Sequence, residues 1–501
     1  MSMLSDLALG LSVALTPANL LFCLIGALLG TLIGVLPGVG PVATIAMLLP
    51  ITYTLSPTGA LIMLSGIYYG AQYGGSTTAI LVNIPGETSS VVTCLDGHPM
   101  ARQGRAGPAL AIAAIGSFFA GCVATLVIVL VSGPLVALAQ AFGPAEYFAL
   151  MVLGLVLTIV LARGSPLKAV AMILTGLLLS LVGTDVHTGA ERLTFGLPLL
   201  QGGLDFVPLA MGVFGLSEIV SNLEKGEGAK GEMIAAHITG LMPTWEDIKA
   251  SAPAILRGTA LGSALGVLPG ASSMIASFAS YTLEKKLAAD PSRFGKGAIE
   301  GVAGPESANN AGAQVSFIPM LTLGIPSNSV MALMIGAMMI QGIQPGPMII
   351  AKQPELFWGL IASMWIGNAM LVIINLPLIG IWVRLLNIPY GLLFPAILLL
   401  CAIGVYSMNN EPGEVLLTAG AGVFGYFLLK LRCEPAPLLL GFVLGAMMEE
   451  NLRRAMLLSR GDPMIFFSNP LSAVLLGASV LLILITVFPS VKSGREKLVE
   501  D

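Results

Sequence analysis

The chain has 501 residues and a formal net charge of −4, and 56% of its residues are hydrophobic whereas only 10% are charged. Soluble domains carry about 25% charged residues, so this composition and a mean hydropathy of +0.91 exclude an ordinary soluble protein. The charges form no basic run, and we therefore expect no nucleic acid partner. The composition predicts an all-α polytopic membrane protein, because each spanning helix needs about 20 predominantly apolar residues.

Apolar stretches recur along almost the whole chain. In chain order they cover residues 17–36, 41–54, 59–83, 108–140, 145–162, 167–183, 206–220, 253–282, 298–340 (with breaks), 355–385, 389–408, 414–430, 435–448 and 470–490. Several are too long or too short for one span, so we expect about 10–14 membrane segments, some of them broken or re-entrant helices. A polar connector at 222–252 would divide a first transmembrane repeat, 1–221, from a second, 253–501, which ends in C-terminal helices and a short polar tail.

An internal repeat supports this division. In each half, four glycines spaced by four residues end in a Gly-Val-Leu-Pro-Gly run. They are Gly26, Gly30, Gly34 and Gly38, and 232 residues later Gly258, Gly262, Gly266 and Gly270. A second motif, Gly-Ala-Gln followed by Ile-Pro, begins at Gly70 and again at Gly312, at an offset of about 241. The two halves are therefore predicted to share one architecture.

The loop charges predict that the two repeats insert in opposite senses. Residues 55–58, after the first motif, are uncharged, whereas the counterpart at 284–296 contains four basic residues. After the second motif the bias reverses, since Arg102 and Arg105 follow in the first half and residues 341–355 have Lys352 as their one basic residue. Because basic loops favour the cytoplasmic side, we expect an inverted repeat.

Proline and glycine interrupt corresponding apolar segments at Pro37–Pro41 and Pro269–Ser273. Non-helical backbone is tolerated at membrane depth only inside protein or beside a water-filled cavity, and paired interruptions are the best sequence indication of a transporter's binding site. The glycine spacing alone is equally consistent with tight helix packing. We assign coupling to Na⁺ or H⁺ to these breaks and to two nearby carboxylates. The predicted ion-coupling residues are Gly38, Gly40, Glu87, Gly270, Ser272, Ser273 and Glu306.

Hydroxyl and amide side chains cluster around the second pair of motifs. Such groups bind Na⁺ through oxygen or hydrogen-bond a carboxylate without a fixed buried charge. Interhelical hydrogen bonding is the alternative interpretation, and the substrate and ion roles of the two sets could be exchanged. The predicted substrate-binding residues are Gln72, Tyr73, Gly75, Ser76, Thr77, Asn83, Asn309, Asn310, Gln314, Ser327 and Asn328.

Glu87 and Glu306 stand inside these polar motifs. A carboxylate within the membrane is a functional hypothesis by default, as a cation ligand or a proton carrier. Each of the two could equally lie at a helix end on the surface.

Motifs of soluble catalysis are absent from the sequence. It has no phosphate-binding loop, no His-Glu-x-x-His and no Gly-x-Ser-x-Gly, so we expect neither ATP hydrolysis nor another enzyme activity. The five cysteines and three histidines lack ligand spacing, so no cofactor or metal is expected apart from Na⁺ as a coupling ion.

Five runs together resemble the large membrane subunit of the tripartite tricarboxylate transporters, the TctA family. They are Gly-Val-Leu-Pro-Gly at 34–38, Tyr-Gly-Ala-Gln-Tyr-Gly-Gly-Ser at 69–76, Asn-Ile-Pro-Gly at 83–86, Gly-Pro-Glu-Ser-Ala-Asn-Asn-Ala at 304–311 and Leu-Gly-Ile-Pro at 323–326. The resemblance extends over nearly the entire chain.

The resemblance implies a multi-pass permease of the bacterial inner membrane. It implies a small TctB-like membrane subunit and a periplasmic TctC-like solute-binding protein as partners, and uptake of tricarboxylates or related organic carboxylates driven by a Na⁺ or H⁺ gradient. A stand-alone carboxylate carrier or a channel remains the alternative. The paired interruptions suggest an elevator-like motion as a hypothesis for the mechanism.

Overall fold

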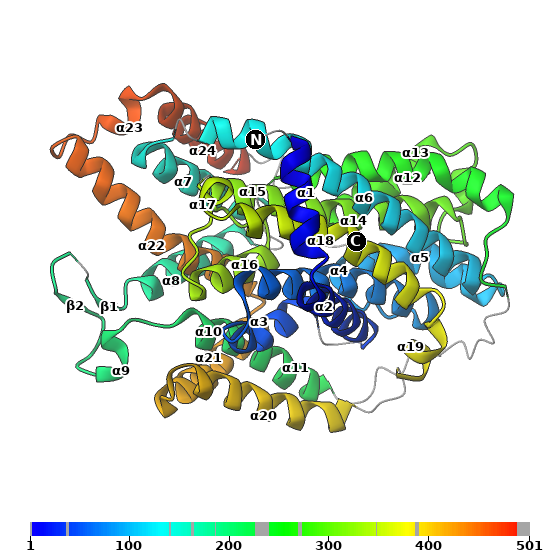
Figure 1. The fold of residues 1–501 in the computed structure, drawn as a ribbon, viewed down its shortest axis with the longest axis horizontal. Helices are drawn as coiled ribbons and strands as arrows, with labels where there is room; N and C mark the ends of the chain where they lie inside the picture. Colours follow the sequence, from blue (N-terminus) through cyan, green and yellow to red (C-terminus); the bar gives the residue numbers. More distant parts are fainter. Residues whose placement is uncertain are drawn as a thin grey trace.

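The chain is helical almost throughout, as the composition predicts (Figure 1). The computed structural model describes residues 3–36, 40–139, 142–161, 165–185, 187–225, 240–268, 273–346, 348–385 and 390–487. Within these ranges the strands are β1 (Gly183–Thr184) and β2 (Glu191–Arg192), which pair antiparallel. The all-α prediction is confirmed.

Apolar helices of membrane-spanning length are present. In the described ranges, five helical stretches are long and apolar enough to cross a membrane: Pro17–Val35, Ala106–Leu135, Phe206–Glu224, Pro354–Asn375 and Pro412–Lys430. Seven shorter apolar helices of 10–17 residues accompany them. This is the helix content of a polytopic membrane protein, and the number of segments that cross the bilayer stays a prediction.

The first half begins with a compact unit of six elements. They are α1 (Met3–Ala14), α2 (Pro17–Val35), α3 (Pro41–Thr52), α4 (Pro57–Val82), η1 (Thr88–Ser90) and α5 (Val91–Arg102). Proline is the first residue of α2, α3 and α4, where its missing N–H removes no hydrogen bond because the first amides of a helix have no partner within it. The predicted break around Pro37 falls between α2 and α3, and residues 37–39 lie outside the described ranges.

The second half repeats this order of elements. They are α12 (Trp245–Gly266), α13 (Ser273–Leu287), η4 (Pro291–Arg293), α14 (Glu300–Val315), α15 (Phe317–Leu323), α16 (Ser329–Ile340) and α17 (Ile349–Lys352). A capping box between Thr244 and Asp247 starts α12 at Trp245, because it satisfies two backbone amides at the helix end. The helix therefore begins inside the stretch predicted as a polar connector, of which residues 226–239 are not described.

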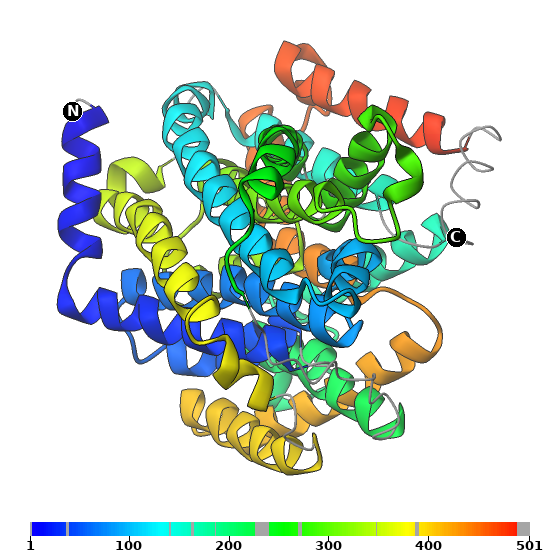
Figure 2. The same ribbon diagram turned by 90° about the vertical axis from the view of Figure 1, so that its right-hand side faces the viewer.

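The remaining helices pack around these two units (Figures 1 and 2). α6 (Ala106–Ala139) contacts α12 and α14, and α18 (Pro354–Asn375) contacts α1, α2, α4 and α6. α22 (Pro435–Leu458) packs on α7 (Pro144–Leu161) and α8 (Pro166–Ser180). The others are α9 (Pro198–Gln201), α10 (Phe206–Ala210), η2 (Met211–Leu216), α11 (Ser217–Lys225), α19 (Ile379–Leu385), α20 (Tyr390–Asn409), α21 (Pro412–Lys430), α23 (Ile465–Ser468) and α24 (Pro470–Val487).

The glycines of each ladder lie against backbone carbonyl oxygens of a neighbouring helix. A Cβ added to any of six glycines would stand 2.2–2.4 Å from such an oxygen, far inside van der Waals contact. In the first half Gly26, Gly30 and Gly34 of α2 face Met63, Ile67 and Ala71 of α4; in the second, Gly258, Gly262 and Gly266 of α12 face Gly304, Ala308 and Gly312 of α14. The paired residues differ by 232 in the glycine helices and by 241 in their partners, so the repeat predicted from sequence is present in the packing.

Reciprocal contacts between the halves indicate a two-fold relation. Gln341, just after α16, donates from Nε2 to the Leu55 carbonyl oxygen at 3.3 Å. Gln103, just after α5, donates in the same way to the Lys296 carbonyl oxygen at 2.8 Å. Leu55 and Lys296 differ by 241 residues, so each half gives the other the same contact, as in a two-fold interface. The two charge-poor loops meet at one of these contacts and the two basic loops at the other.

The sense of insertion is tested by mapping the membrane side of these loops. We expect reporter tags inserted near Thr58 and near Ala289 to lie on opposite sides, with Ala289 in the cytoplasm because its loop is basic. A tag near Gln103 is the control and should match Ala289, whose loop it touches. Impermeant labelling of intact cells reads out each position, and the same side for Thr58 and Ala289 would contradict the inverted repeat.

Substituting a ladder glycine should destabilise the fold. We expect Gly262→Ala to lower the melting temperature of the detergent-purified protein by several degrees, because overpacking costs roughly 1–3 kcal/mol. The matched control is Gly420→Ala in α21, where an added Cβ meets nothing within 4 Å and alanine favours the helix. Equal melting temperatures for the two variants would show that the close approach is not required.

Candidate functional site

A cavity of about 480 Å³ is lined by residues of both halves. Its lining joins residues next to the two predicted breaks with residues of both Ile-Pro motifs. They include Gly40, Pro41, Tyr68, Gln72, Pro85, Gly86, Glu87, Ser89, Phe214, Glu218, Ser273, Asn328, Ser329, Glu434 and Pro435. Small-molecule sites have volumes of about 300–1,000 Å³. We call this space the central cavity.

Four helices begin at the central cavity. Pro41, Ser273, Ser329 and Pro435 are the first residues of α3, α13, α16 and α22, and all four line it. The first amides of a helix lack partners within it, and the helix dipole adds a partial positive charge of about +0.5 at this end. An anion in the cavity would therefore be stabilised by backbone groups alone.

The ionisable side chains of the cavity are acidic. Glu87, Glu218 and Glu434 line it, and no lysine or arginine of the described ranges does so. Glu218 accepts a hydrogen bond at 3.3 Å from the backbone N–H of Gly40, at the start of α3. Carboxylate, hydroxyl and carbonyl oxygens are ligands of hard cations. The cavity therefore suits an anion and a cation bound together.

A chain of hydrogen bonds fixes Glu87 at the wall of the cavity. The Ser89 hydroxyl lies 2.9 Å from Gln72 Oε1 and also bonds to Glu87 Oε1. Asn309 of α14 donates from Nδ2 to the same Glu87 oxygen at 3.2 Å. Residues from α4, η1 and α14 thus hold one carboxylate, and the network crosses from the first half to the second.

The two-fold relation extends into the site. Asn328 Nδ2 lies 3.4 Å from the Tyr68 hydroxyl, while its Oδ1 accepts from the Met331 N–H and caps α16. Tyr68 and Asn309 differ by 241 residues, and so do Glu87 and Asn328. The Tyr68–Asn328 contact is therefore the counterpart of the Asn309–Glu87 contact, with an amide in place of the carboxylate.

Glu306 is buried between α4, α5 and α14, apart from the cavity lining. Its exposed fraction is 1%. Ser76 donates to its Oε2 at 2.6 Å and Thr93 donates to its Oε1. Neither partner is cationic, and an ionised carboxylate without a cation is costly within the membrane. This environment suits a carboxyl group that exchanges a proton.

The structure divides the predicted substrate-binding residues into two groups. Gln72 and Asn328 line the central cavity, and Asn309 reaches it through Glu87. Gly75 lies behind Glu87, since a Cβ added there would be 2.8 Å from Glu87 Cγ. Asn83 ends α4 on the surface with φ 59°.

The other predicted substrate residues make interhelical or local contacts away from the central cavity. Asn310 donates to Ser117 at 2.7 Å, Gln314 accepts from Thr125 at 2.7 Å, and Ser327 donates to the Ser316 carbonyl at 3.1 Å. Tyr73, Ser76 and Thr77 line a separate space of about 10 Å³ beside Ser117 and Asn375. For these six residues the interhelical alternative describes the observed contacts.

The predicted ion-coupling residues also separate. Gly40, Glu87 and Ser273 line the central cavity, and Glu306 lies apart from it. Gly38, Gly270 and Ser272 lie outside the described residues.

Several residues of the site were not predicted from the sequence. Tyr68 and Ser89 had local signals, since Tyr68 precedes Gln72 by one helical turn and Ser89 ends the motif that contains Glu87. Thr93, Glu218 and Glu434 had none, because only the fold brings them to the two conserved-looking halves of the site.

Comparison with known proteins places the chain in a family. The model of the tripartite tricarboxylate transporter TctA family matches residues 20–440. An uncharacterized 52.8 kDa protein in the TAR-I ttuC′ 3′ region of Agrobacterium vitis is 59% identical over 498 residues, 99% of each chain. An uncharacterized protein in the TAR-II ttuC′ 3′ region of the same organism is 60% identical over 241 residues, which are 48% of this chain and all of that protein. No solved structure matches. The chain therefore belongs to the TctA family of tripartite tricarboxylate transporters.

Proposed function

We propose that the protein is the permease subunit that carries a tricarboxylate or related organic carboxylate across the bacterial inner membrane, driven by a Na⁺ or H⁺ gradient. Its partners in this proposal are a small TctB-like membrane subunit and a periplasmic TctC-like binding protein. Family membership supports the transporter class. The observation that carries the proposal is the central cavity, where four helix starts and three carboxylates meet.

The cavity can bind a carboxylate without a basic side chain. The amides at the starts of α13 and α16 and the side chains of Gln72, Ser273 and Asn328 supply hydrogen-bond donors. Half-helix starts facing an anionic substrate group recur in secondary transporters with broken helices. In this scheme Glu87, Glu218 and Glu434 attract the coupling cation, and Glu306 is the alternative carrier of a coupled proton.

Reconstituted uptake tests the function directly. Proteoliposomes containing the chain and its small membrane partner should accumulate labelled citrate when a Na⁺ gradient is imposed and the matching binding protein is present. A parallel pH gradient tests proton coupling. Uptake that needs neither gradient nor binding protein would contradict the proposal in favour of a channel or a stand-alone carrier.

A charge placed at Asn328 should weaken substrate binding without unfolding the helix. We expect Asn328→Asp to raise the KM for citrate uptake at least about tenfold, or 1.4 kcal/mol, because the new carboxylate repels the substrate. Aspartate caps a helix as well as asparagine does, so the melting temperature should not change. The comparison variant is Asn310→Asp, which lies off the cavity; an equal rise in KM there would contradict this placement of the substrate.

Removing the charge of Glu87 should weaken cation coupling. We expect Glu87→Gln to raise the half-saturating Na⁺ concentration for uptake at least about tenfold, because a neutral amide attracts a cation less than a carboxylate does. Glu246→Gln, on the exposed first turn of α12, controls for net charge. Uptake that ignores Na⁺, follows the pH gradient and is lost in Glu306→Gln would assign coupling to a proton at Glu306 instead.

A further inference from the structure

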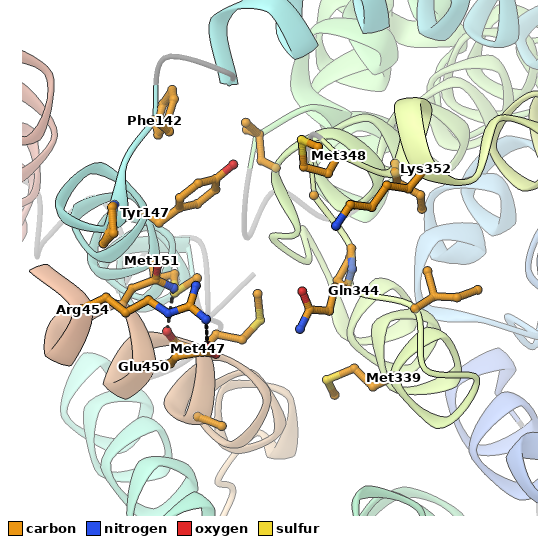
Figure 3. A pocket seen from close by; sticks show the side chains of 18 of the residues that line it. Phe142, Tyr147, Met151, Met339, Gln344, Met348, Lys352, Met447, Glu450 and Arg454 are labelled. Atoms are coloured by element: carbon orange, nitrogen blue, oxygen red, sulfur yellow. Dashed lines mark hydrogen bonds and ion pairs between the residues drawn. The ribbon is translucent and has the colours of Figure 1, made fainter. Parts of the chain in front are cut away.

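A second and larger cavity, of about 840 Å³, lies between the end of α16 and the end of α22. Its walls come from residues 142–151 at the start of α7, from residues 339–353 around α17, and from residues 446–454 of α22, together with Leu323. We call it the α16–α22 cavity (Figure 3). None of the residues predicted from the motifs lines it.

Two cationic side chains face each other across this cavity. Figure 3 shows Lys352 and Gln344 on one wall and Tyr147 and Arg454 on the other. Arg454 is paired with Glu450, one turn earlier on α22. Lys352 forms no ion pair with any residue of the described ranges. The cavity thus offers an uncompensated positive charge, in contrast to the acidic central cavity.

The wall formed by α22 is held in place from outside. Arg453, beside Arg454, pairs with Asp185 at 2.6 Å and with Glu449 at 2.7 Å, and Arg192 of β2 joins the same Glu449 at 2.9 Å. The His187 N–H and the Arg453 guanidinium hold the pKa of Asp185 well below its usual range. Because Arg453 is occupied in this network, Arg454 is the arginine of α22 that faces the cavity.

One short segment separates the two cavities. Leu323, the last residue of α15, lines the α16–α22 cavity, whereas Asn328, which caps α16, lines the central cavity. Gly324 between them has φ 72°, and a Cβ added there would lie 2.9 Å from the Pro345 carbonyl oxygen in the wall of the α16–α22 cavity. α16 itself runs from one cavity at Ser329 to the other at Met339, about 18 Å for 12 residues.

The rest of the lining is polar at the charged ends and flexible between them. Met151, Met339, Met348 and Met447 contribute thioether side chains, which adapt to differently shaped ligands. A deep apolar pocket would exclude a hydrated carboxylate, but Gln353, Asn451 and Tyr147 keep hydrogen-bonding groups at the walls.

We propose that the α16–α22 cavity is a second binding site for small di- and tricarboxylates, from which the anion reaches the central cavity past residues 324–327. The site rests on the proposed function for its role in transport. Lys352 supplies the attraction and Arg454 orients the carboxylates from the opposite wall. The loop after α16 is poor in basic residues, so the positive-inside rule assigns this cavity to the periplasmic side, where the substrate arrives.

Charge-selective labelling tests the cavity without relying on transport. The five free cysteines, Cys23, Cys94, Cys122, Cys401 and Cys433, lie outside its lining and are replaced, and Met348→Cys is introduced one helical turn from Lys352. We expect an anionic thiol reagent to react faster, relative to a cationic one, when Lys352 is present. Lys352→Gln should lower this rate ratio about threefold or more, since both reagents sense the lost charge.

Matched variants and added citrate complete the experiment. Lys352→Arg should restore the ratio, and Lys286→Gln, on the exposed end of α13, should leave it unchanged. Millimolar citrate should slow labelling at least threefold with Lys352 present and have no effect in Lys352→Gln. An unchanged rate ratio, or citrate protection that persists without Lys352, would overturn the proposed site.

Uptake then separates this proposal from the transport function. In reconstituted vesicles Lys352→Gln should raise the KM for citrate at least fivefold and leave kcat unchanged. Labelling that behaves as expected in a protein without citrate uptake would retain the anion site and reject the proposed function. Full uptake with an unaltered KM in Lys352→Gln would retain the function and reject a role for this site in it.

Discussion

The contact between ladder glycines and backbone carbonyl oxygens determines how the two halves are built. Because no side chain stands between α2 and α4, or between α12 and α14, each pair of helices approaches backbone to backbone. Such close approach is how helices associate in a membrane, where burial of apolar surface gives no advantage over contact with lipid. The contact also sets the register, since moving one helix by a single residue would rotate the glycines by about 100° away from their partners.

This fixed register carries the broken helices to one place. α3 and α13 follow the glycine helices, while η1 and α16 follow their partners, so their starts are positioned by the same two contacts. The reciprocal pairs, Gln341 with Leu55 and Gln103 with Lys296, show that the relation between the halves is two-fold. A two-fold relation allows equivalent helix starts to line a shared cavity. The differences between the halves, such as Glu87 opposite Asn328, then give the cavity its chemistry.

The sequence predicted the repeat and the breaks because both depend on glycine and proline, whose backbone effects are local. It could not separate the polar residues that line the cavity from those that join helices. Gly70-Ala71-Gln72 matches Gly312-Ala313-Gln314 at an offset of 242, whereas the packing pairs Ala71 with Gly312 at 241. That single residue turns Gln314 by about 100°, so it bonds to Thr125 of α6 while Gln72 faces the cavity. Glu218 and Glu434 reach the site only through tertiary packing.

The charge of the central cavity constrains what can occupy it. Three carboxylates line it, and four helix starts at about +0.5 each offset only part of their charge. A tricarboxylate would add further negative charge to a space in which the described residues supply no lysine or arginine. Repulsion between like charges grows as water is excluded, because the effective dielectric constant falls. Substrate alone would therefore be disfavoured in a closed cavity, and cations entering with it would restore the balance. In this arrangement coupling to an ion gradient follows from electrostatics, without a dedicated gate that senses the ion.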